Sequence, residues 1–197
     1  DGHRLGLHKI ECLDNKLGEK IYFIVPAKVA TAIMKVMVGE KINVIPGQGE
    51  VVFDMDTLVI YSRLVEGDFP EYESVIPKEF AAKVTINRKM FLDGLERATL
   101  VTTPEEEVIY LKYKDNKLLM TCESQGLGVA KEEIEVSWEG QAFNIAVNSR
   151  FLIDCVRVAP WENIEIGINS EVAPVLIFGE SDEYQYLIMP LKVRDEE

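Results

Sequence analysis

The fold of this chain is indicated first by residues 83–100, which read KVTINRKMFLDGLERATL. The β-branched residues of 83–86 predict a short strand, and Asn87 predicts the N-cap of a helix that extends to about Leu100. Three further strands are expected after this helix, at 108–114, 117–123 and 128–138. Asp115-Asn116 is suited to the hairpin turn between the first two of them. The segment therefore predicts a β-α-β-β-β unit.

The same order of elements occurs twice more. The upstream unit is expected to contain a strand at 21–25, a helix at 26–38, and strands at 42–45, 51–54 and 58–65. The downstream unit is expected to contain a strand at 142–147, a helix capped by Asn148 or Ser149 that extends to about Val158, and strands at 163–169, 175–179 and 184–193. One more strand is expected at 5–13. Such helix-poor repetition predicts an α+β fold of antiparallel sheets with a few helices on one side.

The composition is that of a globular protein without a membrane span. The 197 residues are 47% hydrophobic and 28% charged, and no apolar run approaches the roughly 20 residues that a spanning helix needs. The chain opens on Asp1 rather than Met and shows no signal peptide, so we expect a cytoplasmic fragment, processed product or trimmed chain. Because composition turns polar near Pro77-Lys78-Glu79, we place a domain boundary there, between 1–78 and 79–197.

Charge is distributed unevenly along the chain. The net charge is −13, from 21 basic and 34 acidic residues, which by itself argues against nucleic acid. The three predicted helices nevertheless carry seven basic residues and only three acidic ones. If the helices line one surface, that surface attracts phosphate. Ordinary amphipathic helices with solvated Lys and Arg would give the same pattern, so the alternative stays open.

No pattern of reactive residues predicts an enzyme. His3 and His8 lie near no nucleophile motif, and three dispersed cysteines, Cys12, Cys122 and Cys155, form no metal-ligand spacing. We therefore expect reduced thiols, no metal and no cofactor. An unrelated β-rich enzyme or ligand-binding domain remains the alternative function.

Four segments, taken together, resemble the bacterial sliding clamp, the β subunit of DNA polymerase III. They are DGHRL at 1–5, RLVEGDFPEY at 63–72 followed by VIP at 75–77, NSRFLID at 148–154, and YLIMPLKV at 186–193. Their order and spacing match the family over nearly the whole chain, and the segment at 63–77 is the most specific. The family's domains are doubled β-α-β-β-β units, which agrees with the repeat found here.

The resemblance implies a division of the chain and a general function. Residues 1–78 would be the latter half of the middle clamp domain, including its linker, and 79–197 the complete third domain. Clamps of this family are homodimeric rings that encircle duplex DNA without reading its sequence, and they act as processivity factors without catalytic residues. The DNA-facing candidates on the helices are Lys28, Lys35, Arg88, Arg97, Arg150 and Arg157.

The family's partner site is a hydrophobic cleft that takes short peptides from the replicative polymerase, the clamp loader and repair proteins. Carried over by motif, the cleft would use Gly2, His3, Arg4, Leu5, Pro70, Val75, Asn148, Phe151, Val172, Pro174, Leu187, Met189, Pro190 and Leu191. Core packing is the competing interpretation for Val75 and Leu187. Ser74 replaces an Arg of many relatives, and the acidic tail at 194–197 could crowd the cleft.

The resemblance also places Leu100 and Val101 at the head-to-tail subunit interface of the ring. Their natural partner is the first domain of another subunit, which these 197 residues do not include. We therefore expect this chain by itself not to close a ring, and to be a monomer or to associate in a different way.

Overall fold

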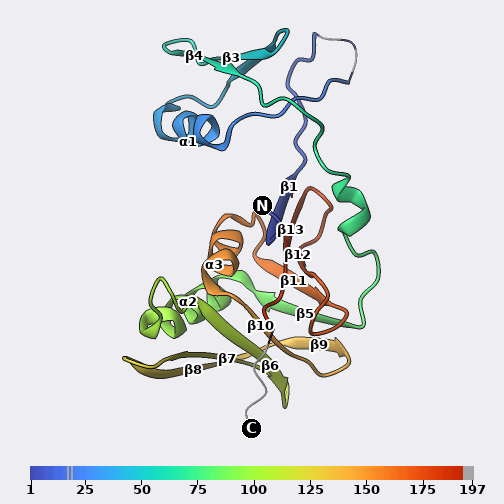
Figure 1. Cartoon of the computed structure of the whole chain (residues 1–197). Coiled ribbons are helices and arrows are strands. Elements are labelled where there is room, and N and C mark those ends of the chain that lie inside the picture. The colour runs from blue at the N-terminus through green and yellow to red at the C-terminus, as the bar shows by residue number, and fades with distance from the viewer. Residues whose placement is uncertain (17, 19, 193–197) are drawn as a thin grey trace. The chain divides into compact units, whose positions relative to one another are not determined.

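A computed structural model of the chain describes residues 1–16, 18 and 20–192 (Figure 1). By their contacts the residues form two units. Unit 1 contains Asp1–Glu11 and Tyr72–Glu197, and unit 2 contains Cys12–Glu71. Each unit is described by itself. No helix in the described part of the chain is long and apolar enough to cross a membrane.

Unit 1 contains two β-α-β-β-β repeats in succession. The first consists of β5 (Ala82–Asn87), α2 (Arg88–Ala98), β6 (Val108–Lys114), β7 (Lys117–Ser124) and β8 (Gly128–Glu135). The second consists of β10 (Asn144–Asn148), α3 (Ser149–Val158), β11 (Asn163–Ile168), β12 (Val175–Phe178) and β13 (Tyr184–Ile188). Outside the repeats lie β1 (Arg4–His8), β9 (Ser137–Gly140) and the 3-10 turns η1 (Tyr72–Val75) and η2 (Thr99–Val101).

The two repeats of unit 1 exchange their first strands. β5 pairs with β11 of the second repeat, with Val84 opposite Ile166, and β10 pairs with β6 of the first repeat, with Ile145 opposite Leu111. The resulting antiparallel sheets have the orders β1-β13-β12-β11-β5-β9 and β10-β6-β7-β8, and α2 contacts α3 (Figure 1). Because each sheet contains strands of both repeats, the repeats share one core.

The residues of α2 that enter the core of unit 1 recur with a helical period. In α2 the buried residues are Phe91, Gly94, Leu95 and Ala98, which recur at three- and four-residue steps along one face. Gly94 permits close packing, since a Cβ there would lie 2.6 Å from Cε of Met120. The α+β class predicted from the sequence is confirmed by this arrangement.

The two helices of unit 1 begin where the sequence predicts. The side chain of Asn87 accepts a hydrogen bond from the Met90 amide at 3.1 Å, and that of Asn148 accepts one from the Phe151 amide at 3.1 Å. Each asparagine satisfies one of the amides that a helix start leaves without an intrahelical partner. Asn148 is therefore the cap of α3, rather than Ser149.

Unit 2 contains a single repeat. Its elements are α1 (Ala27–Val36) and the sheet β2-β3-β4, formed by Asn43–Pro46, Glu50–Asp54 and Val59–Arg63. Val51 and Phe53 of β3 are buried, whereas α1 buries none of its residues. The predicted strand at 21–25 is wrong: only Ile24 pairs, in a single bridge with Val65. In unit 1 the equivalent strands, β5 and β10, each pair with a strand of the other repeat. The described residues of unit 2 contain a single repeat.

Three other strand predictions need correction. The strand expected at 5–13 is β1, which ends at His8 and pairs with β13. The strand expected at 128–138 is divided, because after β8 the chain leaves β7 and adds β9 to β5. The strand expected at 184–193 ends at Ile188, two residues before Pro190, which has no amide hydrogen for a ladder. Residue 193 and the acidic tail at 194–197 lie outside the described residues.

Candidate functional site

Arg4 is the centre of a cluster that joins distant parts of unit 1. Its guanidinium carbon lies 4.1 Å from the ring centroid of Phe151, near the start of α3. One guanidinium nitrogen donates to Asp154 at 3.1 Å and to the Tyr186 hydroxyl at 3.4 Å. The Nε atom donates to Asp1 at 3.3 Å. The guanidinium plane is thus held over an aromatic ring by partners from β13, α3 and the N-terminus.

The electrostatics of this cluster favour a charged arginine. Partial burial alone would lower the pKa of Arg4, but its hydrogen bond to Asp154 and its interactions with Tyr186 outweigh that effect, so the pKa is raised. Burial raises the pKa of Tyr186, against the opposing influence of Arg4. Arg4 is therefore a fixed cation and Tyr186 a neutral hydroxyl at physiological pH.

Backbone pairing brings the first and last motifs of the chain together. Leu5 lies opposite Leu187 in the β1–β13 ladder, and the Met189 amide donates to the His3 carbonyl at 2.8 Å. The Leu191 amide donates to the carbonyl of Ala146 in β10 at 2.7 Å. Residues 3–5 and 187–191 consequently lie side by side, next to the start of the second repeat.

The cleft candidates differ in exposure. Met189 and Leu191 are each 37% exposed, and Val172 is 73% exposed. Gly2, His3 and Val75 are also exposed, whereas Arg4, Leu5, Asn148, Phe151, Pro174 and Pro190 are half-buried. Leu187 is 5% exposed, so it supports this surface from the core. Pro70 is exposed and belongs to unit 2.

Two members of the cluster, Asp154 and Tyr186, were not among the residues predicted for the site. Asp154 lies three positions after Phe151, which places the two side chains on the same face of a helix. That three-residue spacing is the feature of the sequence that could have indicated Asp154 as a member of the site. The contact of Arg4 with Tyr186 depends on the pairing of strands 182 residues apart, which no local pattern indicates.

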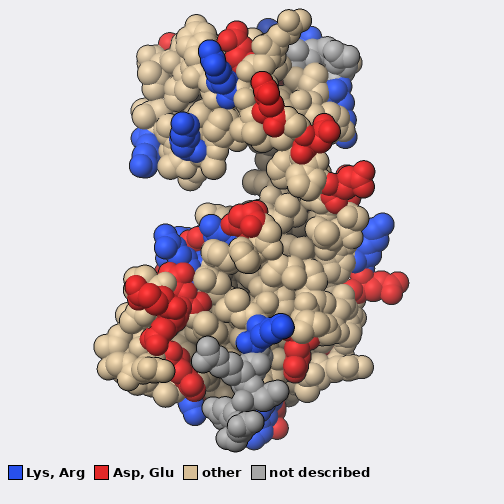
Figure 2. Space-filling model, viewed as in Figure 1, with Lys and Arg blue, Asp and Glu red and all other residues tan. Residues whose placement is uncertain are grey.

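The helix arginines of unit 1 that were predicted to face DNA are all engaged in intramolecular contacts. Arg97 donates from two nitrogens to both carboxylate oxygens of Glu132, at 3.1 and 2.7 Å. Arg157 lies 2.9 Å from Glu96, Arg150 lies 3.8 Å from Glu107, and Nε of Arg88 donates to the Trp161 carbonyl. Figure 2 shows basic and acidic side chains next to one another on the visible face of unit 1.

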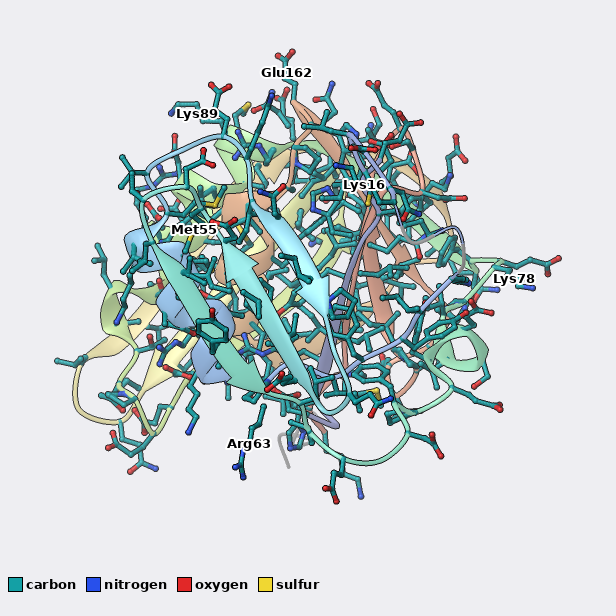
Figure 3. The ribbon with its side chains drawn as sticks, turned by 90° about the horizontal axis from the view of Figure 1, so that it is seen from above. Lys16, Met55, Arg63, Lys78, Lys89 and Glu162 are labelled. Atoms are coloured by element: carbon teal, nitrogen blue, oxygen red, sulfur yellow. The ribbon has the colours of Figure 1, made fainter. Side chains whose placement is uncertain are left out.

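The Arg97–Glu132 pair is held mainly by its hydrogen bonds. They raise the pKa of Arg97 and lower that of Glu132, so both groups are charged at neutral pH. In contrast, neither Lys28 nor Lys35 of α1 forms an ion pair with any residue that the structure describes. Lys89 of α2 points outward (Figure 3), and its ammonium nitrogen lies 2.6 Å from a carboxylate oxygen of Asp93.

The predicted subunit-interface residues lie in η2, directly after α2. Leu100 is 78% exposed, and Val101 is partly buried against the core of unit 1. No group of three or more His, Cys, Asp or Glu side chains that could hold a metal occurs among residues 1–16, 18 and 20–192.

The fold of unit 1, with its doubled repeat, defines the class of the protein as that of the sliding clamps. A DNA polymerase III beta subunit from Eubacterium rectale superposes with a TM-score of 0.90 at 26% identity, over 98% of this chain and 53% of that one. A sliding clamp from Bartonella birtlesii, solved bound to griselimycin, superposes with a TM-score of 0.86 at 25% identity, over 98% and 53%.

Sequence comparison gives the family. The model of the central domain of the DNA polymerase III beta subunit matches residues 1–71, and that of its C-terminal domain matches residues 73–192. The beta sliding clamp of Rickettsia bellii is 31% identical over 98% of this chain and 55% of its own length. The chain therefore belongs to the DNA polymerase III beta subunit family. It spans about half the length of these relatives.

Proposed function

We propose that this chain is the partner-binding and DNA-holding portion of a sliding clamp, the processivity factor of a replicative DNA polymerase. Residues 1–78 would be the latter half of the middle clamp domain, and 79–197 the third domain. The observation that carries the proposal is the meeting of 3–5 with 187–191 around the Arg4–Phe151 cluster. Two motifs at opposite ends of the chain lie side by side there, and Met189 and Leu191 of the second motif are exposed.

The exposed apolar side chains among the cleft candidates are suited to a short hydrophobic peptide. Met189, Leu191 and Val172 expose apolar atoms, and Met adapts its shape to different partners. Arg4 is already oriented by Asp154 and Tyr186, so little side-chain freedom is lost when a peptide packs beside it. The proposed occupants are peptides of the polymerase, the clamp loader and repair proteins.

The proposed contact with DNA is weak and independent of sequence. Lys28 and Lys35 would meet phosphates directly, whereas Arg88, Arg97, Arg150 and Arg157 would first exchange an intramolecular partner. Backbone contacts of this kind give affinity without base recognition. We further propose a cytoplasmic accessory role without catalytic residues, and a ring interface at Leu100 and Val101 in the full-length protein.

Peptide binding tests the proposal. A fluorescent peptide of the Gln-Leu-x-Leu-Phe type is titrated into the 197-residue chain while its polarisation is recorded. We expect saturable binding that weakens roughly tenfold in Met189→Ala, a loss of about 1.4 kcal/mol of binding free energy. Leu127→Ala, a change at a residue that is 61% exposed in the turn after β7, should bind as the wild type does. Equal binding by both variants would contradict the assigned surface.

A further inference from the structure

In both repeats of unit 1 the chain crosses from one sheet to the other after its last long strand. In the first repeat it leaves β8 and, at Ser137, pairs with Thr85 of β5. In the second repeat it leaves β13 and, at Leu191, pairs with Ala146 of β10. Thr85 lies two residues before the N-cap of α2, and Ala146 lies two residues before the N-cap of α3. The two crossings are therefore equivalent places in the two repeats.

The second crossing contains Met189 and Leu191 of the proposed peptide cleft, and the first crossing contains a hollow. The hollow has a volume of about 440 Å³ and is lined by residues 85–87, 135–137 and Asn163. These residues come from β5, from the junction of β8 with β9, and from the start of β11. All of them belong to unit 1, so the hollow is formed within a single unit.

The hollow is polar at the places where the second crossing is apolar. The strand pairings relate each polar residue of the hollow to one apolar residue of the second crossing: Ser137 to Leu191, Glu135 to Met189, Thr85 to Ala146, and Asn163 to Val108. The exchange removes apolar contacts and supplies hydroxyl, carboxamide and carboxylate oxygens that accept hydrogen bonds. The first crossing is therefore suited to a ligand of a different chemical kind from the hydrophobic peptide.

Backbone pairing holds the residues that line the hollow. β5 lies between β9 and β11 in the six-stranded sheet, and its Ile86 is 3% exposed. The Val136 amide donates to the Asn116 carbonyl at 3.2 Å, which fixes the junction of β8 with β9. The side-chain oxygen of Asn87 accepts from the Met90 amide at 3.1 Å, so the Asn87 amide nitrogen is left to donate to a ligand. The polar side chains are thus carried on a rigid frame.

Glu135 gives the hollow a negative charge. Within the part of the chain that the structure describes, its carboxylate forms no ion pair, and Lys117, which lies opposite it in the β7–β8 ladder, pairs with Glu133 at 3.0 Å. Arg88, at the start of α2, donates from Nε to the Trp161 carbonyl. The net charge of −13 on the whole chain adds to the attraction for cations. The hollow therefore favours a cationic group.

We propose that this hollow is a second peptide-binding site, separate from the hydrophobic cleft, which takes an arginine side chain of a partner protein. A guanidinium group has five N–H donors in one plane. The Glu135 carboxylate, the hydroxyls of Thr85 and Ser137 and the Asn163 carboxamide supply the acceptors. The Asn87 amide nitrogen donates to a main-chain carbonyl of the same peptide.

The shape of the hollow and its single charge favour a peptide side chain over other ligands. Thr85, Glu135, Ser137 and Asn163 are all exposed, so a free small molecule would be only partly enclosed, whereas small-molecule sites enclose most of their ligand. An arginine is also held by the peptide that carries it. Among the residues that line the hollow, Glu135 is the one carboxylate, which is too few for a dedicated calcium or magnesium site.

NMR titration tests the proposal, since it detects the weak binding of a single side chain. N-acetyl-arginine methylamide is added to the isotope-labelled chain, and we expect saturable shifts of the backbone amides of residues 85–87, 135–137 and Asn163. The corresponding citrulline compound is neutral and similar in shape, so it should bind roughly tenfold more weakly. Equal shifts with both compounds, or no saturable shift of these amides with the arginine compound, would overturn the proposal.

Variants locate the site. Glu135→Gln should weaken binding of the arginine compound roughly tenfold, whereas Glu123→Gln, the same change at an exposed residue of β7, should leave it unchanged. Asn163→Val, which introduces the residue type of Val108, should weaken it roughly threefold. The three positions are exposed, and circular dichroism checks that each variant is folded. Binding that Glu135→Gln leaves unchanged would also overturn the proposal.

The hydrophobic cleft is tested separately from the hollow. Met189→Ala should weaken the hydrophobic peptide and leave binding of the arginine compound unchanged, and Glu135→Gln should have the opposite effects. If only the hydrophobic peptide fails to bind, the proposed function is contradicted and the second site stands. If only the arginine compound fails to bind, the second site is contradicted and the proposed function stands.

Discussion

At the scale of single residues, burial separates the three cysteines. Cys12 is exposed, whereas Cys122 and Cys155 are buried. Burial raises the pKa of the Cys122 thiol to about 11 and that of Cys155 to about 12. Since the thiolate is the reactive form, the two buried cysteines are inert at neutral pH for two reasons, access and ionisation.

Alkylation tests this assignment. Iodoacetamide at neutral pH should modify Cys12 of the native chain, and should reach Cys122 and Cys155 only after unfolding in urea. The raised pKa values also make the stability of the folded chain depend on pH. Folding raises these pKa values above the roughly 8.5 of a free thiol. The two neutral thiols therefore contribute fully to the free energy of unfolding below that pH, and this contribution is lost as the pH rises towards 11–12. Native modification of Cys122 would contradict the core described here.

Stability depends on which side of α2 a residue occupies. Phe91 is 0% exposed in the shared core of unit 1, and its neighbour Met90 is 52% exposed. Phe91→Ala should lower the free energy of unfolding by about 3–5 kcal/mol, because it leaves a cavity. Met90→Ala, the control one position away, should change it by less than about 0.5 kcal/mol. Urea denaturation measures both; similar losses would contradict the orientation of α2.

At the scale of elements, the helices of unit 1 are basic in sequence but largely compensated in space. Glu132 of β8 reaches Arg97 of α2, and Glu96 of α2 reaches Arg157 of α3. Carboxylates thus occupy the guanidinium groups that phosphates would otherwise contact. The helix face is consequently a weaker anion site than its count of arginines indicates.

The removal of one such carboxylate should strengthen DNA binding. Glu132→Gln leaves Arg97 without its anionic partner, so we expect tighter binding to duplex oligonucleotides and a dependence on salt that is steeper by about one ion. Glu133→Gln is the matched control: the charge change is identical, but Glu133 pairs with Lys117 of the neighbouring strand. Anisotropy titrations at several salt concentrations distinguish the two. Equal effects would show net charge alone at work, and would argue against Arg97 as a DNA contact.

At the scale of the whole molecule, the two units differ in how many of their elements contribute buried residues to a core. The core of unit 1 draws on both helices and on strands of both sheets, whereas in unit 2 α1 contributes no buried residue. Local opening costs least where few apolar contacts resist it. Unit 2 should therefore exchange its amide hydrogens faster than β6 and β7 of unit 1.

A buried charge in unit 2 tests whether the units are independent. Val51 is 0% exposed, so Val51→Asp places an unpaired carboxylate in the small core of β3. Hydrogen-exchange mass spectrometry should then show lost protection over 43–63 and unchanged protection over β6 and β7. Val59→Asp, at a residue that is 44% exposed in β4, should have a much smaller effect. Loss of protection in β6 would mean that the units unfold together.

The sequence by itself determined the helices and most of the strands. The helix caps Asn87 and Asn148 and the hairpin turn at Asp115-Asn116 depend on only a few neighbouring residues, and the structure contains all three. The motifs also sufficed for the family. The cleft and DNA-facing residues, however, were carried over from the resemblance and stay predictions until binding is measured.

Only the tertiary structure decided which segments meet. The strand expected at 21–25 lacks a ladder because strand formation needs a neighbour, and a neighbour is a property of the fold rather than of the segment. In the same way, β1 pairs with β13, Arg4 donates hydrogen bonds to Asp154 and Tyr186, and Arg97 forms an ion pair with Glu132. These contacts join residues far apart in the chain, so no local pattern encodes them. They exist because the helices and sheets of unit 1 pack into one structure, which brings these distant segments side by side.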